Sequence, residues 1–307
     1  MGISVVIPVY NSESCADGLV YKLTTVMQPL NKPFEIILVN DGSKDRSWDK
    51  IVELSAVNNT VKGVNFSKNF GQDNALMAGL IHSSGKSVII MDDDCQHDPC
   101  DIPSLLLQIE KGYDVCYANF ASKKQSFIKN FGSWFNGKVA NIVIGKPDAI
   151  YLSSYKAVSR LVVDEITKYD GPFPYIDGLI FGITRNITQI PATHYERLAG
   201  ESNYSFIKLI SVWFIQATSF SIIPLRMATF LGFIFAAVSF ISIVLLFMRH
   251  FYSGTNPSGW VAMTVVMLFL GGIQLVMIGV IGEYVGRLAL YNNKKPQFVI
   301  KTMVGLD

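Results

Sequence analysis

The first part of the chain alternates short apolar runs with longer amphipathic stretches. The runs hold four to seven residues, are rich in Val and Ile, and are predicted strands: Ile3–Val9, Phe34–Val39, Gly63–Phe66, Ser87–Met91 and Asp114–Ala118. The stretches between them have helical spacing: Cys15–Met27, Trp48–Val57, Asp73–His82 and Ile102–Lys111. Strands that alternate with helices predict an α/β fold whose mostly parallel sheet is covered on both faces.

The pattern changes at Met227, after which the chain is almost wholly apolar. No charged residue lies between Arg226 and Arg249, and Trp260–Gly282 contains Gln274 as its only strongly polar side chain. Because about 20 apolar residues in a helix span a bilayer, residues 227–290 are predicted to form a two-helix transmembrane hairpin. Two buried core helices are the alternative, although soluble cores rarely need helices that are apolar all round.

The flanks of the hairpin predict its orientation. Residues 205–226 are apolar but are broken by Lys208 and Gln216, which favours an interfacial amphipathic helix over a core helix. More basic residues flank the two spans on the outside than lie in the loop between them, so the positive-inside rule places both termini in the cytoplasm. The predicted organisation is a soluble domain at 1–204, the interfacial helix, the hairpin and a cytoplasmic tail at 291–307.

Composition narrows the class of protein. The formal net charge is +2 and no long run of like charge occurs, so nucleic-acid binding is not expected. The four cysteines form no CxxC pair and have no His partner at zinc-site spacing, which favours free thiols in a reducing compartment.

Polar, glycine-bearing segments follow the predicted strands. They are Pro8-Val9-Tyr10-Asn11, Asn40-Asp41-Gly42-Ser43, Lys68-Asn69-Phe70-Gly71-Gln72 and Asp92-Asp93-Asp94. In parallel sheets, ligands bind outside the carboxyl ends of the strands, so four such segments predict one ligand site.

The acidic triplet Asp92-Asp93-Asp94 suggests a metal ion. Three adjacent carboxylates repel one another near a core, and a bound cation relieves that repulsion. Alternate residues of an extended chain point the same way, so Asp92 and Asp94 face away from Asp93. Hard oxygen ligands suit Mg²⁺ or Mn²⁺, which neutralises a departing diphosphate. Capping of the next helix by Asp94 is the alternative, and His97 is not expected to be a ligand.

The segment GLIHSSGKS at residues 79–87 resembles a phosphate-binding P-loop but departs from it in two ways. Its spacer is one residue too long, and it precedes a predicted strand instead of following one. A simple turn is therefore predicted.

Several motifs together resemble a known family. They are SVVIPVYNSES, PFEIILVNDGSKDRS, NFGQDNALMAGL, MDDDCQHDP, ERLAGESNYSFIKL and IGEYVGR, and they cover nearly the whole chain in order. The sequence is similar to polyprenyl-phosphate glycosyltransferases of the inverting GT-A family 2. Bactoprenol glucosyltransferases and undecaprenyl-phosphate aminoarabinose transferase resemble it most, and dolichol-phosphate mannose synthase is more distant.

The resemblance implies roles for individual residues. The implied nucleotide-binding residues are Pro8, Tyr10, Asn11, Asp41, Asn69, Gln72, Asp92 and Asp93. Gln96 is implied beside a metal held by Asp92 and Asp94, and the implied catalytic residues are Asp94, Asp148 and Arg197. Contacts to lipid phosphate are implied for Lys123, Lys124, Lys129, Arg197 and Ser202. The chain departs from the family pattern at Asp93, around Asp148, and where Lys123, Lys124, Lys129 and Lys138 stand in place of arginines.

The expected function is inverting transfer of a hexose from a nucleotide sugar to undecaprenyl phosphate at the inner face of a bacterial membrane. UDP-glucose is the first expectation for the donor, and UDP-aminoarabinose, UDP-N-acetylglucosamine and GDP-mannose are alternatives. Other readings are a processive polysaccharide synthase, whose Gln-x-x-Arg-Trp motif is absent here, or a non-catalytic nucleotide-sugar-binding membrane protein. The resemblance also implies a homo-oligomer, possibly a tetramer.

Overall fold

The chain divides into two compact units. In the computed structural model, Met1–Asn203 and Lys294–Asp307 form a sheet unit, whereas Tyr204–Asn293 form a helical unit. The structure describes residues 2–120, 150–192, 259–292 and 296–306, with single residues between Phe230 and Tyr252. The following predicted features lie outside these residues: Lys123, Lys124, Lys129, Lys138, Asp148, Arg197, Ser202 and the interfacial helix at 205–226.

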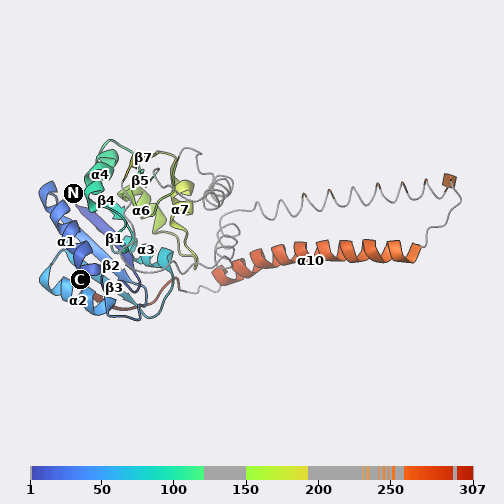
Figure 1. The fold of residues 1–307 in the computed structure, drawn as a ribbon, viewed down its shortest axis with the longest axis horizontal. Helices are drawn as coiled ribbons and strands as arrows, with labels where there is room; N and C mark the ends of the chain where they lie inside the picture. The colour runs from blue at the N-terminus through green and yellow to red at the C-terminus, as the bar shows by residue number, and fades with distance from the viewer. Residues whose placement is uncertain are drawn as a thin grey trace. The chain divides into compact units, whose positions relative to one another are not determined.

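The sheet unit is built on eight strands in the order β7-β5-β6-β4-β1-β2-β3-β8 (Figure 1). The first five in sequence are β1 (Ile3–Val9), β2 (Phe34–Asn40), β3 (Val61–Phe66), β4 (Ser87–Ile90) and β5 (Val115–Asn119). They match the five predicted strands, with ends that differ by at most two residues. The added strands are β6 (Lys156–Ser159), β7 (Ile187–Pro191) and β8 (Ile300–Val304).

Most strand pairs are parallel, as predicted. β1 pairs in parallel with β2 and β4, β2 with β3, and β5 with β7. The exceptions are β6, which runs antiparallel to β4 and β5, and β8, which runs antiparallel to β3. The carboxyl ends of β1, β2, β3 and β4 therefore lie at one edge of the sheet.

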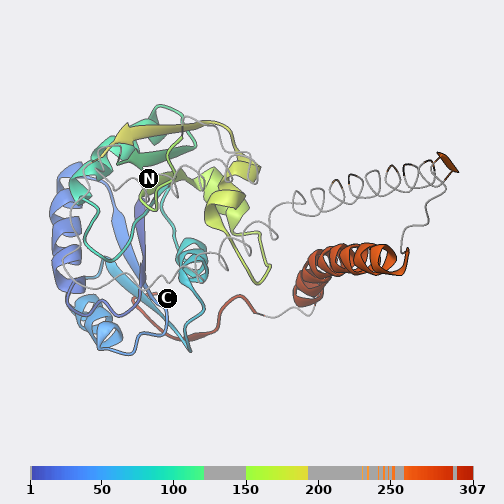
Figure 2. The same ribbon diagram turned by 45° about the vertical axis from the view of Figure 1, so that its right-hand side comes forward.

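Helices cover both faces of the sheet, as Figure 2 shows. On one face lie α1 (Ala16–Met27), η1 (Gln28–Leu30), α2 (Ser47–Val57), η2 (Pro99–Asp101) and α4 (Ile102–Glu110). On the other lie α3 (Gln72–Ile81), α6 (Arg160–Ile166) and α7 (Ile176–Ile183). The central strands β1, β2 and β4 are buried from both sides, which explains their continuous apolar sequence.

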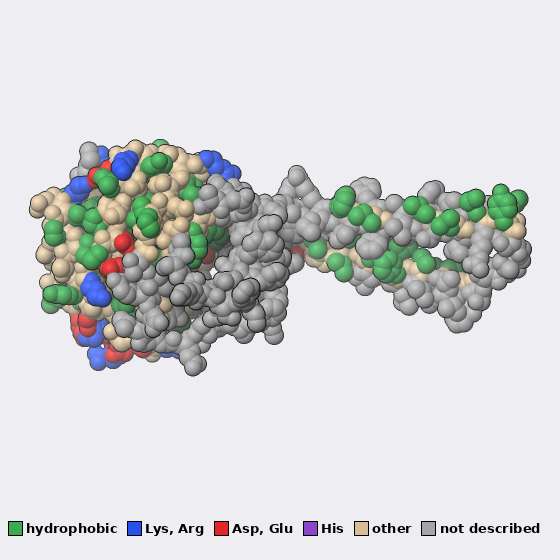
Figure 3. Space-filling model, turned by 45° about the horizontal axis from the view of Figure 1, so that its top comes forward, with side chains coloured by type: hydrophobic (Ala, Val, Ile, Leu, Met, Phe, Trp, Pro, Cys, Tyr) green, Lys and Arg blue, Asp and Glu red, His purple; other side chains and the backbone are tan. Residues whose placement is uncertain are grey.

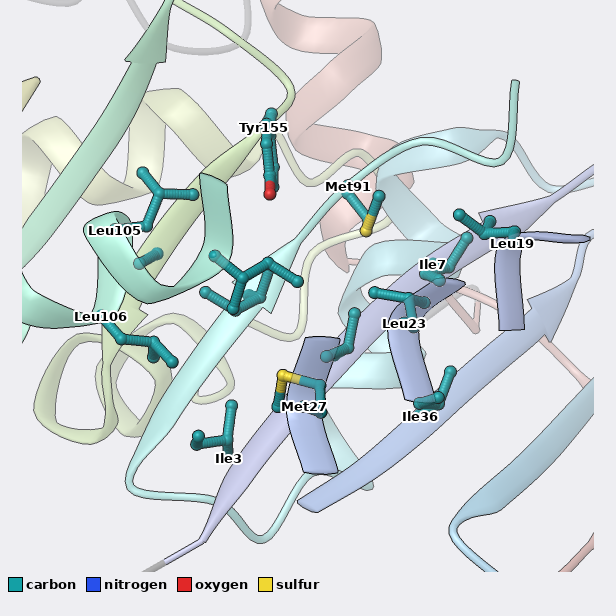
Figure 4. Close-up of a cluster of buried hydrophobic side chains, with 14 of the residues drawn as sticks. Ile3, Ile7, Leu19, Leu23, Met27, Ile36, Met91, Leu105, Leu106 and Tyr155 are labelled. Atoms are coloured by element: carbon teal, nitrogen blue, oxygen red, sulfur yellow. The ribbon is translucent and has the colours of Figure 1, made fainter. Parts of the chain in front are cut away.

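The packing of α1 shows how helical spacing builds this core. Leu19, Leu23 and Met27 recur every four residues, so they share one face of the helix. Figure 4 shows them beside Ile7 and Ile36 of the sheet. All five side chains are at most 2% exposed. Burying a side chain of this size contributes about 1.5–3 kcal/mol to folding.

The end of the chain corrects one prediction. Residues 291–307 are expected as a tail, but Ile300–Val304 form β8 at the edge of the sheet. Val304 and Ile300, at the two ends of β8, pack against the two hydrophobic clusters of the core. The three residues between them are exposed, so the strand is short and partly polar. Such an edge strand carries a weak sequence signal.

The helical unit contains the 34-residue helix α10 (Gly259–Asn292). Its described hydrophobic side chains lie on the outside of the unit (Figure 3). Within it, Phe269–Gly286 is long and apolar enough to cross a membrane, with a mean hydropathy of 1.6 and no buried residue. Among the described residues this is the only such stretch, and most of the first predicted span lies outside them.

Candidate active site

The polar segments predicted to meet do lie at one edge of the sheet. Strand register places Val9 opposite Asn40, and Asn40 opposite Asn65, while Val6 pairs with Ile90. Each strand ends within a residue or two of its polar segment. The parallel order of β4, β1, β2 and β3 therefore brings the four segments to the same rim.

Asp92 is held from two sides. One carboxylate oxygen accepts a hydrogen bond from Gln72 Nε2 at 2.7 Å, and the other accepts one from the Ser154 hydroxyl. Ser154 reaches the rim because β6 runs antiparallel to β4, with Lys156 paired to Ile90. Bonds from fixed donors to both oxygens set the orientation of the carboxylate. Sequence analysis did not select Ser154, which is 62 residues away in the chain.

His97 supports the same residue from the protein interior. Its ring lies between Phe120 and Tyr155, with centroid distances of 5.6 Å and 5.0 Å. The Asp92 amide donates to His97 Nδ1 at 3.2 Å, and His97 Nε2 lies 3.5 Å from the Ser154 oxygen. His97 thus contacts the backbone of Asp92, the first residue of the triplet.

Asp93 is hydrogen-bonded to the loop that follows β1. Its Oδ2 accepts hydrogen bonds from the Tyr10 amide at 3.0 Å and from the Ser12 hydroxyl. Burial raises the pKa of Asp93 to about 6, and the two donors partly oppose that rise. The Asp93 carboxylate therefore supports the loop after β1.

Asp94 turns back on its own loop. Its Oδ1 accepts from the Gln96 amide at 3.1 Å, across Cys95, whose φ of 58° is in the left-handed region. The following 3₁₀ helix η2 is capped by Asp98, whose side chain accepts from the Cys100 amide. The alternative that Asp94 caps the next helix is therefore wrong. Gln96 lies in the same turn, as the resemblance implies.

The rim offers two carboxylates, those of Asp92 and Asp94, that could bind a divalent cation. Asp92 and Asp94 offer hard oxygen donors at the rim, and each oxygen of Asp92 keeps a lone pair beyond its one hydrogen bond. No group of three or more His, Cys, Asp or Glu side chains able to hold a metal occurs in the described residues. Mg²⁺ and Mn²⁺ are commonly held by one or two carboxylates with water and substrate phosphate, so two carboxylates suffice.

Asp41 clamps the loop that follows β3, residues 68–72, which we call the donor loop. Asp41 Oδ1 accepts from the Phe70 amide at 2.6 Å and Oδ2 from the Gly71 amide at 2.9 Å. Burial raises the pKa of Asp41 above its usual value, and these two bonds offset part of the effect. At Gly42, with φ of +65°, a Cβ would lie 2.5 Å from the Asn69 nitrogen, so only glycine fits.

The loop after β1 is joined to the loop after β2. The Asn11 amide donates to Ser43 Oγ at 3.0 Å, and Asn11 Oδ1 accepts from the Lys44 amide at 2.8 Å. Asn11 adopts a left-handed φ of 54°, which asparagine tolerates. Tyr10 is 44% exposed beside it, whereas Pro8 lies inside β1. Of the implied nucleotide contacts, Tyr10, Asn11, Asn69 and Gln72 are exposed, whereas Asp41 is buried.

A buried ionic cluster lies under the rim, and sequence analysis missed it. Lys156, 2% exposed, forms an ion pair with Asp177, which also accepts from Tyr117 Oη at 2.8 Å. The Lys156 ammonium lies 5.0 Å from the centre of the Tyr117 ring. Burial, with the nearby charge of Asp177, raises the pKa of Asp73 to about 6. The cluster joins β5, β6, α3 and α7.

The GKS segment forms a turn at the opposite edge of the sheet, as predicted. It connects α3 to β4, and the Ser84 amide donates to Glu35 Oε1 at 2.7 Å. The Gly85 amide donates to Ser4 Oγ at 2.8 Å. Both amides donate to side chains of the domain itself. In a phosphate-binding loop, the backbone amides are left free to donate to the phosphate.

The fold and the rim are those of a GT-A nucleotide-sugar transferase, and sequence comparison defines the family. Residues 4–167 match the glycosyl transferase family 2 domain, and residues 223–288 match the GtrB C-terminal hairpin. The chain belongs to glycosyl transferase family 2.

Full-length relatives support this assignment. The chain is 32% identical to the uncharacterized glycosyltransferase sll0501 of Synechocystis sp. over 99% of its own length and 96% of the relative. It is 29% identical to the uncharacterized glycosyltransferase YkcC of Bacillus subtilis, over 99% of this chain and 94% of that one.

Among solved structures, glucosyl-3-phosphoglycerate synthase from Mycobacterium tuberculosis has the same fold. Its complex with Mn²⁺, UDP and phosphoglyceric acid gives a TM-score of 0.51 at 17% identity, covering 70% of this chain and 78% of the synthase. A complex of that enzyme with Mn²⁺ and UDP-glucose gives a TM-score of 0.50, also at 17% identity, over 70% and 79%. At this identity the likeness shows the fold.

Proposed function

We propose that the protein transfers a hexose from a nucleotide sugar to a polyprenyl phosphate, with inversion at the anomeric carbon. The observation that carries the proposal is the pairing of two parts in one chain. A family 2 domain with an acidic rim is joined to a GtrB C-terminal hairpin. The rim suits a nucleoside diphosphate, and a membrane hairpin suits an acceptor that resides in the bilayer.

The connectivity of the sheet supports a hairpin that crosses twice. The helical unit leaves the sheet unit after Asn203 and rejoins it at Lys294, and β8 pairs with β3 of the same sheet. A folded sheet lies on one side of a membrane, so both ends of the helical unit lie on that side. Any crossing by α10 therefore requires a second crossing within Tyr204–Asn293. The basic residues that flank the spans favour the cytoplasm as this side.

The proposed chemistry needs charge neutralisation more than a strong base. A phosphate monoester has a second pKa of about 6, so the acceptor is largely ionised at neutral pH. An Mg²⁺ or Mn²⁺ ion held by Asp92 and Asp94, with Gln96 nearby, would offset the charge of the leaving diphosphate. Gln72, Ser154 and His97 hold Asp92 in place for that task.

Other residues of the proposal come from the family resemblance. Tyr10, Asn11, Asp41 and Asn69 would contact the nucleotide, and Arg197, Ser202, Lys123, Lys124 and Lys129 would contact the lipid phosphate. Asp148 would assist the attack by the acceptor. The proposed assembly is a homo-oligomer.

A donor screen tests the proposal. The purified chain in detergent is incubated with Mg²⁺ or Mn²⁺, undecaprenyl phosphate and one of UDP-glucose, UDP-aminoarabinose, UDP-N-acetylglucosamine or GDP-mannose. We expect one donor, UDP-glucose first, to yield a lipid product detected by mass spectrometry. If the protein binds a donor but neither transfers nor hydrolyses it, the non-catalytic alternative is favoured.

Topology is tested with reporter fusions in a bacterial host. We expect a periplasm-dependent phosphatase to be active when fused in the loop between residues 249 and 259. The same reporter fused after Asp307 is expected to be inactive. Activity of the C-terminal fusion would contradict the cytoplasmic placement of both ends of the hairpin.

A further inference from the structure

We infer that residues Gln297–Val304, which we call the C-terminal strap, form part of the donor site by positioning the donor loop. The inference rests on the proposed function, because it treats the rim as the place where the nucleotide sugar binds. The strap begins five residues after the last residue of α10. The helix α10, which carries the proposed membrane span, is therefore followed in the chain by a segment that supports the proposed donor site.

The strap is fixed along the edge strand β3. Within it, β8 pairs antiparallel with β3, with a register shift between Asn65 and Phe66. Beyond the shift, the Ser67 amide donates to the Val299 carbonyl at 2.9 Å. Ser67 is the residue immediately before the donor loop, so the backbone of the strap holds the point at which that loop begins.

An aromatic series connects the strap to the donor loop. Phe298 stacks on Phe66 with ring centres 5.0 Å apart and planes at 11°. Phe66 in turn meets Phe70 edge to face at 5.6 Å and 85°. Phe70 is the residue whose amide donates to Asp41. Packed aromatic rings fix one another, so Phe298 limits the positions open to Phe70.

A second connection runs through polar side chains. Thr302 Oγ1 accepts from Asn65 Nδ2 at 3.2 Å, and Asn65 Oδ1 accepts from Asn40 Nδ2 at 2.8 Å. Asn40 and Asn65 are 2% and 8% exposed, so the hydrogen bond between them is shielded from solvent, whereas Thr302 is exposed. This second connection ends at Asn40, the residue that directly precedes Asp41.

The donor loop acts on both halves of the candidate site. Its Phe70 and Gly71 amides bind Asp41, and Gln72, at the start of α3, binds Asp92. A shift of the loop therefore displaces the proposed nucleotide contact and the proposed metal ligand together. Loss of the strap is expected to weaken donor binding even where the helical unit is intact.

The test uses three full-length variants in detergent. Phe298→Ala removes the ring, Phe298→Tyr keeps it, and Met303→Ala is the control, since Met303 is 46% exposed on the same strap. Hydrogen exchange of the peptide covering the donor loop is measured with and without UDP. The UDP dissociation constant is measured by calorimetry, and thermal unfolding shows that each variant is folded.

For Phe298→Ala we expect exchange at Phe70 and Gly71 to be about tenfold faster and UDP to bind about tenfold more weakly, as fits the loss of one aromatic pair and its burial. Phe298→Tyr and Met303→Ala should match the wild type. Unchanged exchange and UDP affinity in a folded Phe298→Ala variant would overturn the inference. If exchange is faster in Phe298→Ala but neither the wild type nor the variant binds UDP, the strap positions the loop. The assignment of the loop to a UDP-sugar site would then be overturned.

Discussion

Replacing Asp94 or Asp92 by asparagine is expected to lower turnover at least about a thousandfold, in line with the loss of a group that stabilises transition-state charge. Asparagine has nearly the same shape but no negative charge, so it would bind a divalent cation poorly. Turnover is measured as lipid-linked sugar formed per minute at saturating Mg²⁺ or Mn²⁺.

Asp93→Asn is the matched control within the same triplet. Its side chain supports Tyr10 and Ser12 inside the protein, and asparagine keeps an acceptor for the Tyr10 amide. We expect this variant to stay within about tenfold of the wild type. Ser154→Ala removes one hydrogen bond to Asp92 and should fall between the two, at about a tenfold loss. Equal losses at Asp93 and Asp94 would contradict the division of roles in the triplet.

Replacing Lys156 by methionine is expected to cost about 3–5 kcal/mol of folding free energy, the usual effect of breaking a buried ion pair. Methionine fills a similar volume but leaves Asp177 without its cation, beside Asp73. Lys168→Met is the control, because Lys168 pairs with Glu165 on the surface and should cost less than about 1 kcal/mol. Denaturant unfolding of the full chain in detergent measures both.

The pH dependence of Lys156→Met follows from the same cluster. Burial raises the pKa of the Asp73 carboxyl above its unfolded value, and removal of the Lys156 ammonium, which opposes that rise, lifts the pKa further. Such groups support folding below the unfolded pKa and lose that contribution as pH rises through the folded one. The pKa of Asp73 is already raised to about 6 in the native protein. The loss of stability in Lys156→Met should therefore be smaller at pH 5 than at pH 8, and an equal loss at both would contradict this explanation.

The predictable part of the fold is the part buried from two sides. Strands such as β1 and β2 are apolar throughout, because helices cover both faces, and their boundaries can be read within two residues. The polar rim was predictable for the same reason, since parallel strands end at one edge. The alternation along Asp92–Asp94 also correctly separated Asp93 from its neighbours.

The missed features depend on contacts between distant segments. β8 has an exposed side and a mixed sequence, so its residues resemble a tail until β3 is available as a partner. Ser154 precedes the four-residue strand β6, which has no periodic pattern to mark it. Lys156 is charged and yet almost fully buried, which no local pattern predicts without knowledge of Asp177.

The fold of the sheet unit adds support to the proposed membrane hairpin. Hydropathy alone identifies α10 among the described residues as a possible span. The return of the chain to β8 adds an independent constraint, because a shared sheet holds both ends of the helical unit on one side. The match to the GtrB C-terminal hairpin over residues 223–288 agrees with that constraint.

The central claim is transfer to a lipid phosphate, and one measurement tests it most directly. The purified chain is given labelled UDP-glucose, a divalent cation, and either undecaprenyl phosphate or undecaprenol, which has no phosphate. The account predicts metal-dependent formation of a lipid heavier by one hexose with undecaprenyl phosphate alone, and none with Asp94→Asn. Transfer to neither lipid with any of the four donors, or equal transfer to undecaprenol, would contradict it.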